Sequence, residues 1–171
     1  MTRRLLEMTV DELREAVVAG GGQAYRADQL ADWVYRRGFT DPARMTNVPN
    51  DLAGRFEILT STVAERSDSE DGCTKLLLDL SDGRQVETVL IPTPKRATAC
   101  VSTQAGCSMG CAFCASGLAG FQRNLTAGEI LEQVIYLRQA TDQAITNVVF
   151  MGMGEPLANY DATLAAVKAL I

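Results

Sequence analysis

The strongest constraint on the fold is the alternation of segment types in the C-terminal part of the chain. Residues 97–103 and 145–151 are apolar and rich in residues that favour β-strands, and a helical pattern follows each of them. The first helical pattern opens at residues 126–129 with a capping box, and the second begins near Asp161. This alternation is typical of a parallel α/β sheet or barrel, in which binding loops gather at the C-terminal ends of the strands.

An unusual loop follows each of these two strands. The first loop carries Cys107, Cys111 and Cys114 at C-x-x-x-C-x-x-C spacing, and the second has the sequence Gly-Met-Gly-Glu-Pro at residues 152–156. Three thiolates on one loop can hold three corners of an iron–sulfur cluster and leave one iron open to a small molecule. The cysteine spacing therefore indicates a reactive cluster. A Gly-rich loop alone is weak evidence for a ligand site, but its place beside the cysteine loop strengthens that interpretation.

Three simpler interpretations of the cysteines stay open at this point. Structural zinc normally uses four Cys or His ligands in two spaced pairs, but the chain contains no histidine and no second C-x-x-C pair. A disulfide framework fits poorly with five cysteines and no sign of secretion. Unrelated buried thiols would be common in any core, although these cysteines cluster among Gly, Ser and Ala.

The overall composition describes a globular chain without a basic bias. The 171 residues are 47% hydrophobic, their formal net charge is −5 and the pI is about 4.8, so RNA binding has no support from bulk charge. Residues 97–122 carry no charge but are rich in small polar residues, which favours a buried cofactor pocket over a membrane helix. The absence of a signal sequence and the reduced thiols predict a cytoplasmic protein without a membrane contact.

The first 66 residues are predicted to form a helical module. A capping box at residues 9–12 opens a helix that ends at residues 20–22, and a second helix spans about residues 27–37. Two further turns begin at Asp41 and Asn50. The arginines of this module are nearly balanced by acidic residues, which favours a solvated surface, while a phosphate-binding face stays open as the alternative.

A β-hairpin is predicted after this module. Residues 74–80 and 85–91 have strand character, and Asp82-Gly83 between them is a strong turn signal. The prolines that follow indicate a linker and a domain boundary near residues 92–96. We therefore predict three parts, which are a helical domain at 1–66, a hairpin with its linker at 67–96 and an α/β core at 97–171.

The cysteine spacing and the Gly-Glu-Pro loop of the next strand resemble the radical S-adenosylmethionine (SAM) superfamily. Further segments are similar to the dual-specificity RNA methyltransferases of the RlmN type, which methylate carbon 2 of an adenine in 23S ribosomal RNA and in tRNA. These segments are Tyr-Arg-Ala-Asp-Gln-Leu at 25–30, Val-Glu-Thr-Val-Leu-Ile-Pro at 86–92, Gly-Phe-Gln-Arg-Asn-Leu at 120–125 and Thr-Asn-Val-Val-Phe-Met-Gly-Met-Gly-Glu-Pro at 146–156. The likeness covers nearly the whole chain.

This resemblance implies a role for each candidate residue. The three loop cysteines would bind a 4Fe-4S cluster whose open iron chelates SAM, and Gly154 and Glu155 match the SAM-contacting positions. Glu87 matches the proton acceptor that acts on the adenine carbon. Cys100 matches the cysteine that forms a disulfide with a second, methyl-carrying cysteine to release the product. A reductant such as flavodoxin or ferredoxin would supply the electron.

The sequence departs from the family pattern at its end. The methyl-carrying cysteine should lie far downstream, so we expect an N-terminal fragment that is inactive alone and prone to aggregate. The expected fold is a helical module with a hairpin, followed by the first two βα units of a partial radical-SAM (βα)6 barrel. Two alternatives stay open: a carbon-8 adenine methyltransferase of the same family, and an iron–sulfur electron-transfer module without an RNA substrate.

Overall fold

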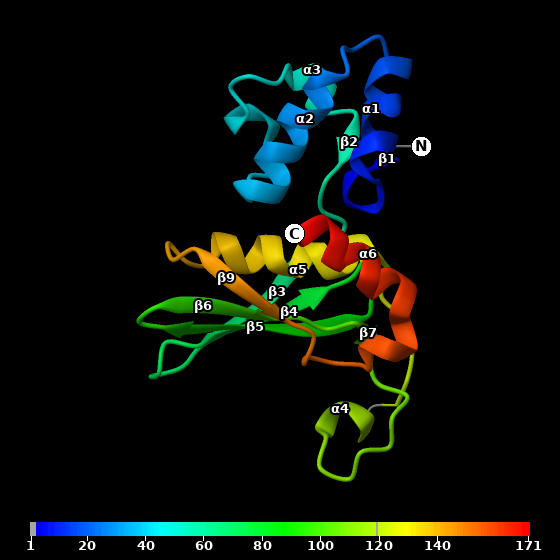
Figure 1. Cartoon of the computed structure of the whole chain (residues 1–171). Coiled ribbons are helices and arrows are strands. Elements are labelled where there is room, and N and C mark those ends of the chain that lie inside the picture. Colours follow the sequence, from blue (N-terminus) through cyan, green and yellow to red (C-terminus); the bar gives the residue numbers. More distant parts are fainter. Residues whose placement is uncertain (1–2, 119) are drawn as a thin grey trace.

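The computed structural model describes residues 3–118 and 120–171, in which helix α5 (Ala127–Gln139) separates a small helical module from a five-stranded sheet (Figure 1). The module comprises η1 (Leu5–Glu7), α1 (Val10–Ala19), α2 (Tyr25–Ala31), the π-helical η2 (Asp32–Arg36), η3 (Pro42–Arg44), α3 (Asn50–Ala53) and the parallel pair β1 (Arg3–Arg4) and β2 (Phe56–Glu57). The capping box predicted for the first helix is present, since the Glu12 N–H donates to Thr9 Oγ1 at 3.2 Å and the Thr9 N–H donates to the Glu12 carboxylate at 2.7 Å.

The second predicted helix differs from its expected form. It begins at Tyr25 rather than near residue 27, and its last turn is π-helical. It ends before Gly38, whose φ of 70° lies in the left-handed region that glycine adopts without strain. At the end of the predicted module, β3 (Thr62–Asp68) is a strand that the sequence patterns did not indicate, and it runs across the predicted boundary at residue 66.

The sheet has the strand order β3-β4-β5-β6-β9. Its strands are β3 (Thr62–Asp68), β4 (Thr74–Asp79), β5 (Gln85–Thr93), β6 (Arg96–Cys100) and β9 (Ile145–Val149). Strands β3 to β6 are antiparallel, whereas β9 runs parallel to β6. The two predicted strand–helix units are present, because α5 follows β6 and α6 (Tyr160–Leu170) follows β9. The α/β class is confirmed, and the six-unit barrel stays a prediction.

The linker predicted near residues 92–96 is wrong. Strand β5 continues to Thr93 and returns through a tight turn into β6, with Thr93 opposite Arg96. Position 92 lies beyond the pairing with β4, which begins at Thr74 opposite Leu90, so a proline there removes no N–H from that pairing. One sheet thus joins the hairpin to the C-terminal strands, and the division into three domains stays a prediction.

Helix α5 is the centre of the hydrophobic core. Its apolar residues are almost fully buried, and so are the polar residues Glu129, Glu132 and Gln133. The helix has the sheet on one side and the helical module on the other, so almost no face is left for water (Figure 1). The carboxylate of Glu132 accepts hydrogen bonds from the backbone and hydroxyl groups of Thr60 and Ser61, which fixes the segment that connects the module to β3.

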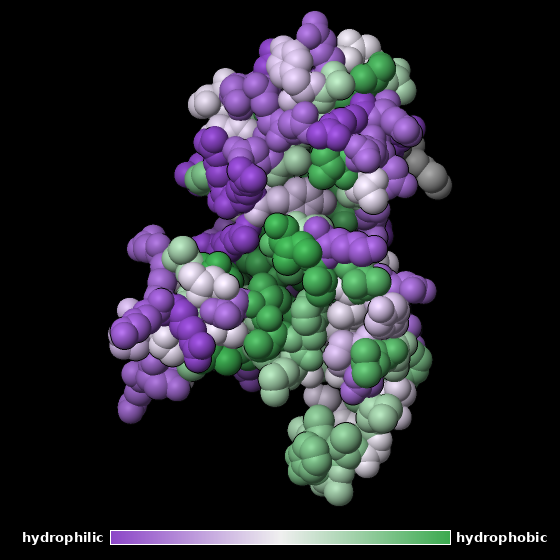
Figure 2. All heavy atoms as spheres, viewed as in Figure 1, coloured by the Kyte–Doolittle hydropathy of each residue, from purple (hydrophilic) through white to green (hydrophobic). Residues whose placement is uncertain are grey.

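The surface is hydrophilic over the module and hydrophobic over α6 and the adjoining edge of the sheet (Figure 2). A groove of about 1080 Å³ lies between α6, α5 and the module, with Leu164, Leu170, Tyr35 and Arg138 in its lining. Burial and the charge of Glu7 raise the pKa of Tyr35 to about 12. Among the described residues, no helix combines the length and apolar character required to cross a membrane.

Candidate functional site

The candidate site lies where β6 and β9 end. The Val101 N–H donates to Val149 O at 2.9 Å, and the Gly152 N–H returns a bond to Val101 O at 3.1 Å. Beyond the strands, the Thr103 N–H donates to Met153 O at 2.8 Å. Because β6 and β9 are parallel, both loops leave the same edge of the sheet, as the sequence pattern predicted.

Ser102 connects three parts of this edge. Its hydroxyl donates to the backbone oxygen of Glu87 on β5 at 2.6 Å and accepts from the Met153 N–H at 2.8 Å. The amide side chain of Gln133 on α5 accepts from the Ser102 N–H at 2.7 Å and donates to Ser102 O at 2.9 Å. All of these groups are buried or half-buried, so β5, α5 and the Gly-rich loop are held in a fixed relation.

The Gly-rich loop packs closely against Gln104 at Gly154. This glycine has a φ of 98°, and a Cβ placed on it would lie only 2.6 Å from Cβ of Gln104. The Gln104 side chain accepts from the Glu155 N–H at 3.1 Å, and the Glu155 carboxylate accepts from the Leu157 N–H at 3.0 Å to cap η4 (Pro156–Asn159). Glycine at position 154 is therefore required by the fold, in addition to any close approach of a ligand.

Glu87 and Cys100 share the face of the sheet that points away from α5. Cys100 lies opposite Val89 in the antiparallel pair of β5 and β6, and Glu87 is two residues from Val89 on the same face. The Glu87 carboxylate binds the ammonium group of Lys75 on β4 at 2.9 Å. Burial raises the pKa of the Cys100 thiol, which keeps it protonated at neutral pH.

The cysteine loop projects from the edge of the sheet and carries the short helix α4 (Ala115–Leu118) (Figure 1). Cys111 is exposed, Cys107 and Cys114 are half-buried, and the Phe113 side chain is 92% exposed. The expectation of a buried pocket across residues 97–122 is therefore wrong for this loop, although residues 101–106 are buried. Hydrogen bonds from the Ser116 backbone and hydroxyl and from the Gly117 backbone lower the pKa of the Cys114 thiol.

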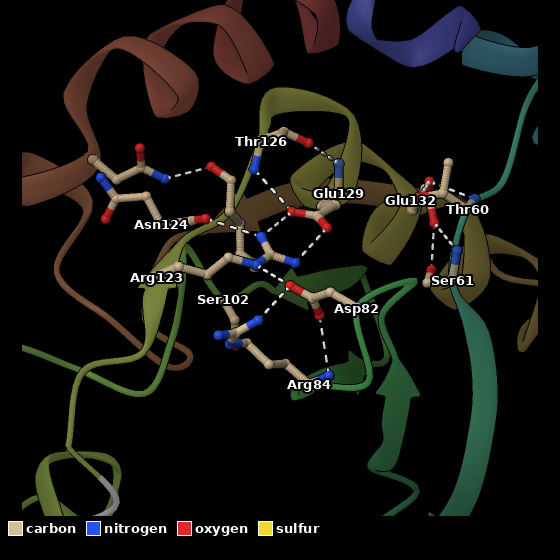
Figure 3. A network of polar contacts seen from close by, with 12 residues as sticks. Thr60, Ser61, Asp82, Arg84, Ser102, Arg123, Asn124, Thr126, Glu129 and Glu132 are labelled. Atoms are coloured by element: carbon tan, nitrogen blue, oxygen red, sulfur yellow. Dashed lines mark hydrogen bonds and ion pairs between the residues drawn. The ribbon is translucent and has the colours of Figure 1, made fainter. Parts of the chain in front are cut away.

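Arg123 anchors the base of the cysteine loop, where β7 (Gln104–Ala105) pairs with β8 (Arg123–Asn124). Its guanidinium binds both oxygens of the Glu129 carboxylate at 2.7 and 2.8 Å and Asp82 Oδ2 at 2.5 Å (Figure 3). Glu129 is buried on α5, whereas Asp82 lies in the turn between β4 and β5. The ion pairs raise the pKa of Arg123 and lower that of Asp82, so the network stays charged at neutral pH.

Two family models match the chain. Residues 4–60 match the ribosomal RNA large subunit methyltransferase N-terminal domain, and residues 101–171 match the radical SAM superfamily. The chain is 43% identical to a probable dual-specificity RNA methyltransferase RlmN of Thermotoga neapolitana, over 98% of this chain and 50% of that protein. It is 45% identical to the dual-specificity RNA methyltransferase RlmN of Solidesulfovibrio magneticus, over 97% of this chain and 50% of that protein.

The chain belongs to the RlmN family of radical SAM proteins. Its fold agrees, because a radical SAM methyltransferase from Sphaerobacter thermophilus superimposes with a TM-score of 0.90 at 42% identity, over 98% of this chain and 52% of that one. The chain spans about half the length of the curated RlmN relatives it matches.

Radical SAM proteins use a 4Fe-4S cluster and SAM, and the residues of this RlmN-family chain fit both. Three cysteine thiols on an accessible loop are the donor set that iron–sulfur clusters take. In residues 3–118 and 120–171, no three Cys, His, Asp or Glu side chains are grouped closely enough to hold a metal ion. Beside the loop, Thr103 Oγ1 is buried without a hydrogen-bond partner in the described chain, which is typical of a site that a ligand completes.

Sequence reasoning missed the residues that position the predicted ones. Ser102, Gln104, Gln133 and Arg123 hold the two loops and β5 together, but none of them belongs to a recognisable catalytic motif. One signal was available for Gln133, because a polar residue in the middle of an otherwise apolar helical segment often has a buried partner. Its partner Ser102, 31 residues away, could only be found from the fold.

Proposed function

We propose that this chain supplies the cluster-binding, SAM-binding and proton-accepting residues of an enzyme that methylates carbon 2 of adenine in 23S rRNA and tRNA. The proposal is supported by the family membership and by one structural observation. Glu87, Cys100, the cysteine loop and the Gly-rich loop come from separate parts of the sequence and lie around one edge and one face of a single sheet. A substrate base at this edge could contact all four.

In this proposal Cys107, Cys111 and Cys114 hold the cluster. The bound cluster and SAM would supply the radical chemistry and the methyl group. Glu155 lies in the loop that ends β9, where its carboxylate can pair with the ammonium group of SAM. The positive φ of the neighbouring Gly154 allows the loop to turn against Gln104, whose side chain accepts a hydrogen bond from the Glu155 N–H.

Glu87 would accept the proton from the adenine carbon, and Cys100 would contribute one sulfur of the disulfide that releases the product. The half-exposed carboxylate of Glu87 is accessible from the open face of the sheet. The raised pKa of Cys100 favours the protonated thiol until a partner sulfur or a base approaches. The adenine must leave its stack in the RNA to reach these groups.

The proposal includes a cytoplasmic location, a flavodoxin or ferredoxin as electron donor, and a six-unit barrel in which the two βα units take part. The donor follows from the family's chemistry, since the cluster requires a reductant, and the location rests on the free thiols of the cysteines. The barrel is consistent with the parallel pairing of β6 and β9.

Two experiments test the function. Anaerobic reconstitution of this chain with iron and sulfide should give a 4Fe-4S signal in electron paramagnetic resonance that changes when SAM is added. The full product of the gene should then convert adenosine in a 23S rRNA transcript to 2-methyladenosine, measured by mass spectrometry after chromatographic separation from the 8-methyl isomer. Formation of 8-methyladenosine would favour the carbon-8 alternative, and a cluster that is indifferent to SAM would favour an electron-transfer module.

A further inference from the structure

Lys75 forms an ion pair with the candidate proton acceptor Glu87, and neither sequence motifs nor the family resemblance assigned it a role. Its ammonium nitrogen lies 2.9 Å from Glu87 Oε1. In the antiparallel register of β4 and β5, Lys75 is opposite Val89 and Glu87 is opposite Leu77. The contact is therefore a diagonal one across neighbouring strands, on the face that also carries Cys100.

Both the backbone and the side-chain carboxylate of Glu87 are fixed by hydrogen bonds. Its backbone oxygen accepts the Ser102 hydroxyl at 2.6 Å, which fixes the strand relative to the two loops. Its carboxylate is bound through Oε1 alone, since within residues 3–118 and 120–171 no donor contacts Oε2. One carboxylate oxygen is thus fixed and the other is available to accept a proton.

The exposure of the pair argues against a mainly structural role. The two side chains are 47% and 46% exposed, and ion pairs in such surroundings add little to the stability of a fold. The hydrogen bond and the charge of Glu87 raise the pKa of Lys75. Lys75 therefore stays an ammonium ion at neutral pH and cannot itself act as the base.

Other charged or titratable groups on this face are less suited to orient the carboxylate. Glu65 on β3 acts on Lys75 by its charge, and Asp79 on β4 accepts a hydrogen bond from Gln85. Cys100 on β6 carries a protonated thiol near neutral pH. Lys75 is the group on this face that binds the Glu87 carboxylate.

We propose that Lys75 is a positioning residue for Glu87, an inference that rests on the proposed function. By holding Oε1, the ammonium group would select the side-chain conformation in which Oε2 faces the bound adenine. The proton would pass from the adenine carbon to Oε2, while Lys75 keeps all of its protons.

The pair is first tested on this chain without cofactors. Selective NMR observation of the Lys75 side chain should show its titration midpoint moving to lower pH in Glu87→Gln, because the carboxylate that stabilises the ammonium is lost. An unchanged midpoint would mean that the two groups do not pair in solution, which overturns the inference.

The role is then tested on the full gene product with its cluster and SAM. Lys75→Met should lower kcat for adenine methylation by about tenfold to a hundredfold, as expected for a misplaced reacting group, with KM for RNA within about twofold. Lys75→Arg should recover most of the rate, and the control Glu65→Gln should leave it unchanged.

An unchanged kcat in Lys75→Met would overturn the inference, and so would a rise in KM alone, which would indicate an RNA phosphate contact. Failure of the unchanged protein to methylate carbon 2 would overturn the proposed function and this inference together, whereas a product formed at a rate insensitive to Lys75 overturns only the inference.

Discussion

Residues 101–106 at the end of β6 are buried, whereas most of the described residues between 107 and 121, which follow directly, are exposed. The first segment makes hydrogen bonds to β5, β9, α5 and the Gly-rich loop. The hydrogen bonds within the cysteine loop connect residues only two or three positions apart, such as Cys114 to Cys111 and Gly117 to Cys114. We call these two segments the floor and the cysteine loop.

This difference separates two ways of building a site. The floor places the Gly-rich loop, Glu87 and Cys100 through the fold alone, so these groups should be in position before any cofactor binds. The cysteine loop has a firm base at Arg123 but few contacts beyond it. Because metal binding can supply the order that a chain lacks, we expect the cluster to organise the loop.

The largest expected effect is the loss of the cluster from a single substitution in the loop. Cys111→Ala should abolish iron binding after anaerobic reconstitution, because two thiolates cannot hold the cluster. It should change the free energy of unfolding of the cofactor-free chain by no more than about 0.5 kcal/mol, since the residue is exposed. Iron analysis and urea denaturation measure the two quantities.

Ser108→Ala is the matched control, because it is an exposed residue of the same loop without a ligand role. This variant should bind iron as the unchanged chain does. Full iron binding by Cys111→Ala would contradict the ligand assignment, and a large loss of stability would contradict the contrast between loop and floor.

A substitution at the boundary between floor and loop should affect stability most. Gly106 has a φ of 73°, and a Cβ there would lie 1.8 Å from the backbone oxygen of Gly120. Gly106→Ala should therefore cost about 3 kcal/mol in the free energy of unfolding, through backbone strain and a clash that a side chain cannot relieve.

Gly110→Ala provides the comparison inside the loop, where a Cβ would meet no atom within 4 Å. Its free energy of unfolding, measured by the same urea titration, should equal that of the unchanged chain. If Gly106→Ala and Gly110→Ala had the same free energy of unfolding, Gly106 would not be tightly packed. The floor and the cysteine loop would then not differ in how firmly the fold holds them.

The same division explains how far the sequence could predict this molecule. Local signals worked where the interaction is local: both capping boxes, the Asp82-Gly83 turn and the parallel strands before each loop are present. The prolines near residue 92 led to a wrong linker prediction, because their place in the sheet depends on where the neighbouring strand β4 begins, which a single segment does not reveal. The uncharged stretch at residues 97–122 led us to expect a buried pocket throughout. Low charge did not distinguish the two parts, because the buried floor and the exposed cysteine loop both lack charged residues.

The positioning residues were beyond reach for a related reason. Ser102, Gln104 and Gln133 act through partners that lie 15 to 51 residues away in the sequence. The cysteine spacing alone indicated Cys107, Cys111 and Cys114, whereas the roles of Glu87, Cys100, Gly154 and Glu155 came from the family resemblance and stay predictions. The structure adds the register that places Glu87 and Cys100 on one face of the sheet.

Two adjacent buried hydroxyls of the floor offer a finer test. Ser102→Ala removes a hydroxyl that binds Glu87 O and Met153 N–H, which should cost about 2 kcal/mol in the free energy of unfolding. Thr103→Val removes a hydroxyl without a partner in the described chain, so it should be neutral or stabilising. Equal losses in the two variants, measured by thermal or urea denaturation, would show that the network around Ser102 does not hold the floor.

The smallest expected effect concerns the reactivity of the Cys100 thiol, which lies on β6 next to the floor. Burial raises the pKa of Cys100, and the thiolate is the reactive form, so alkylation of folded Cys100 should accelerate about tenfold per pH unit and level off at a higher pH than in the unfolded chain. In the urea-unfolded chain the rate should level off near the ordinary cysteine pKa of about 8.5. The experiment uses a variant with the three loop cysteines replaced by alanine, so that tryptic peptides carry Cys73 and Cys100 separately for mass spectrometry. If the alkylation rates of folded and unfolded Cys100 levelled off at the same pH, the fold would not shield this thiol before substrate binding.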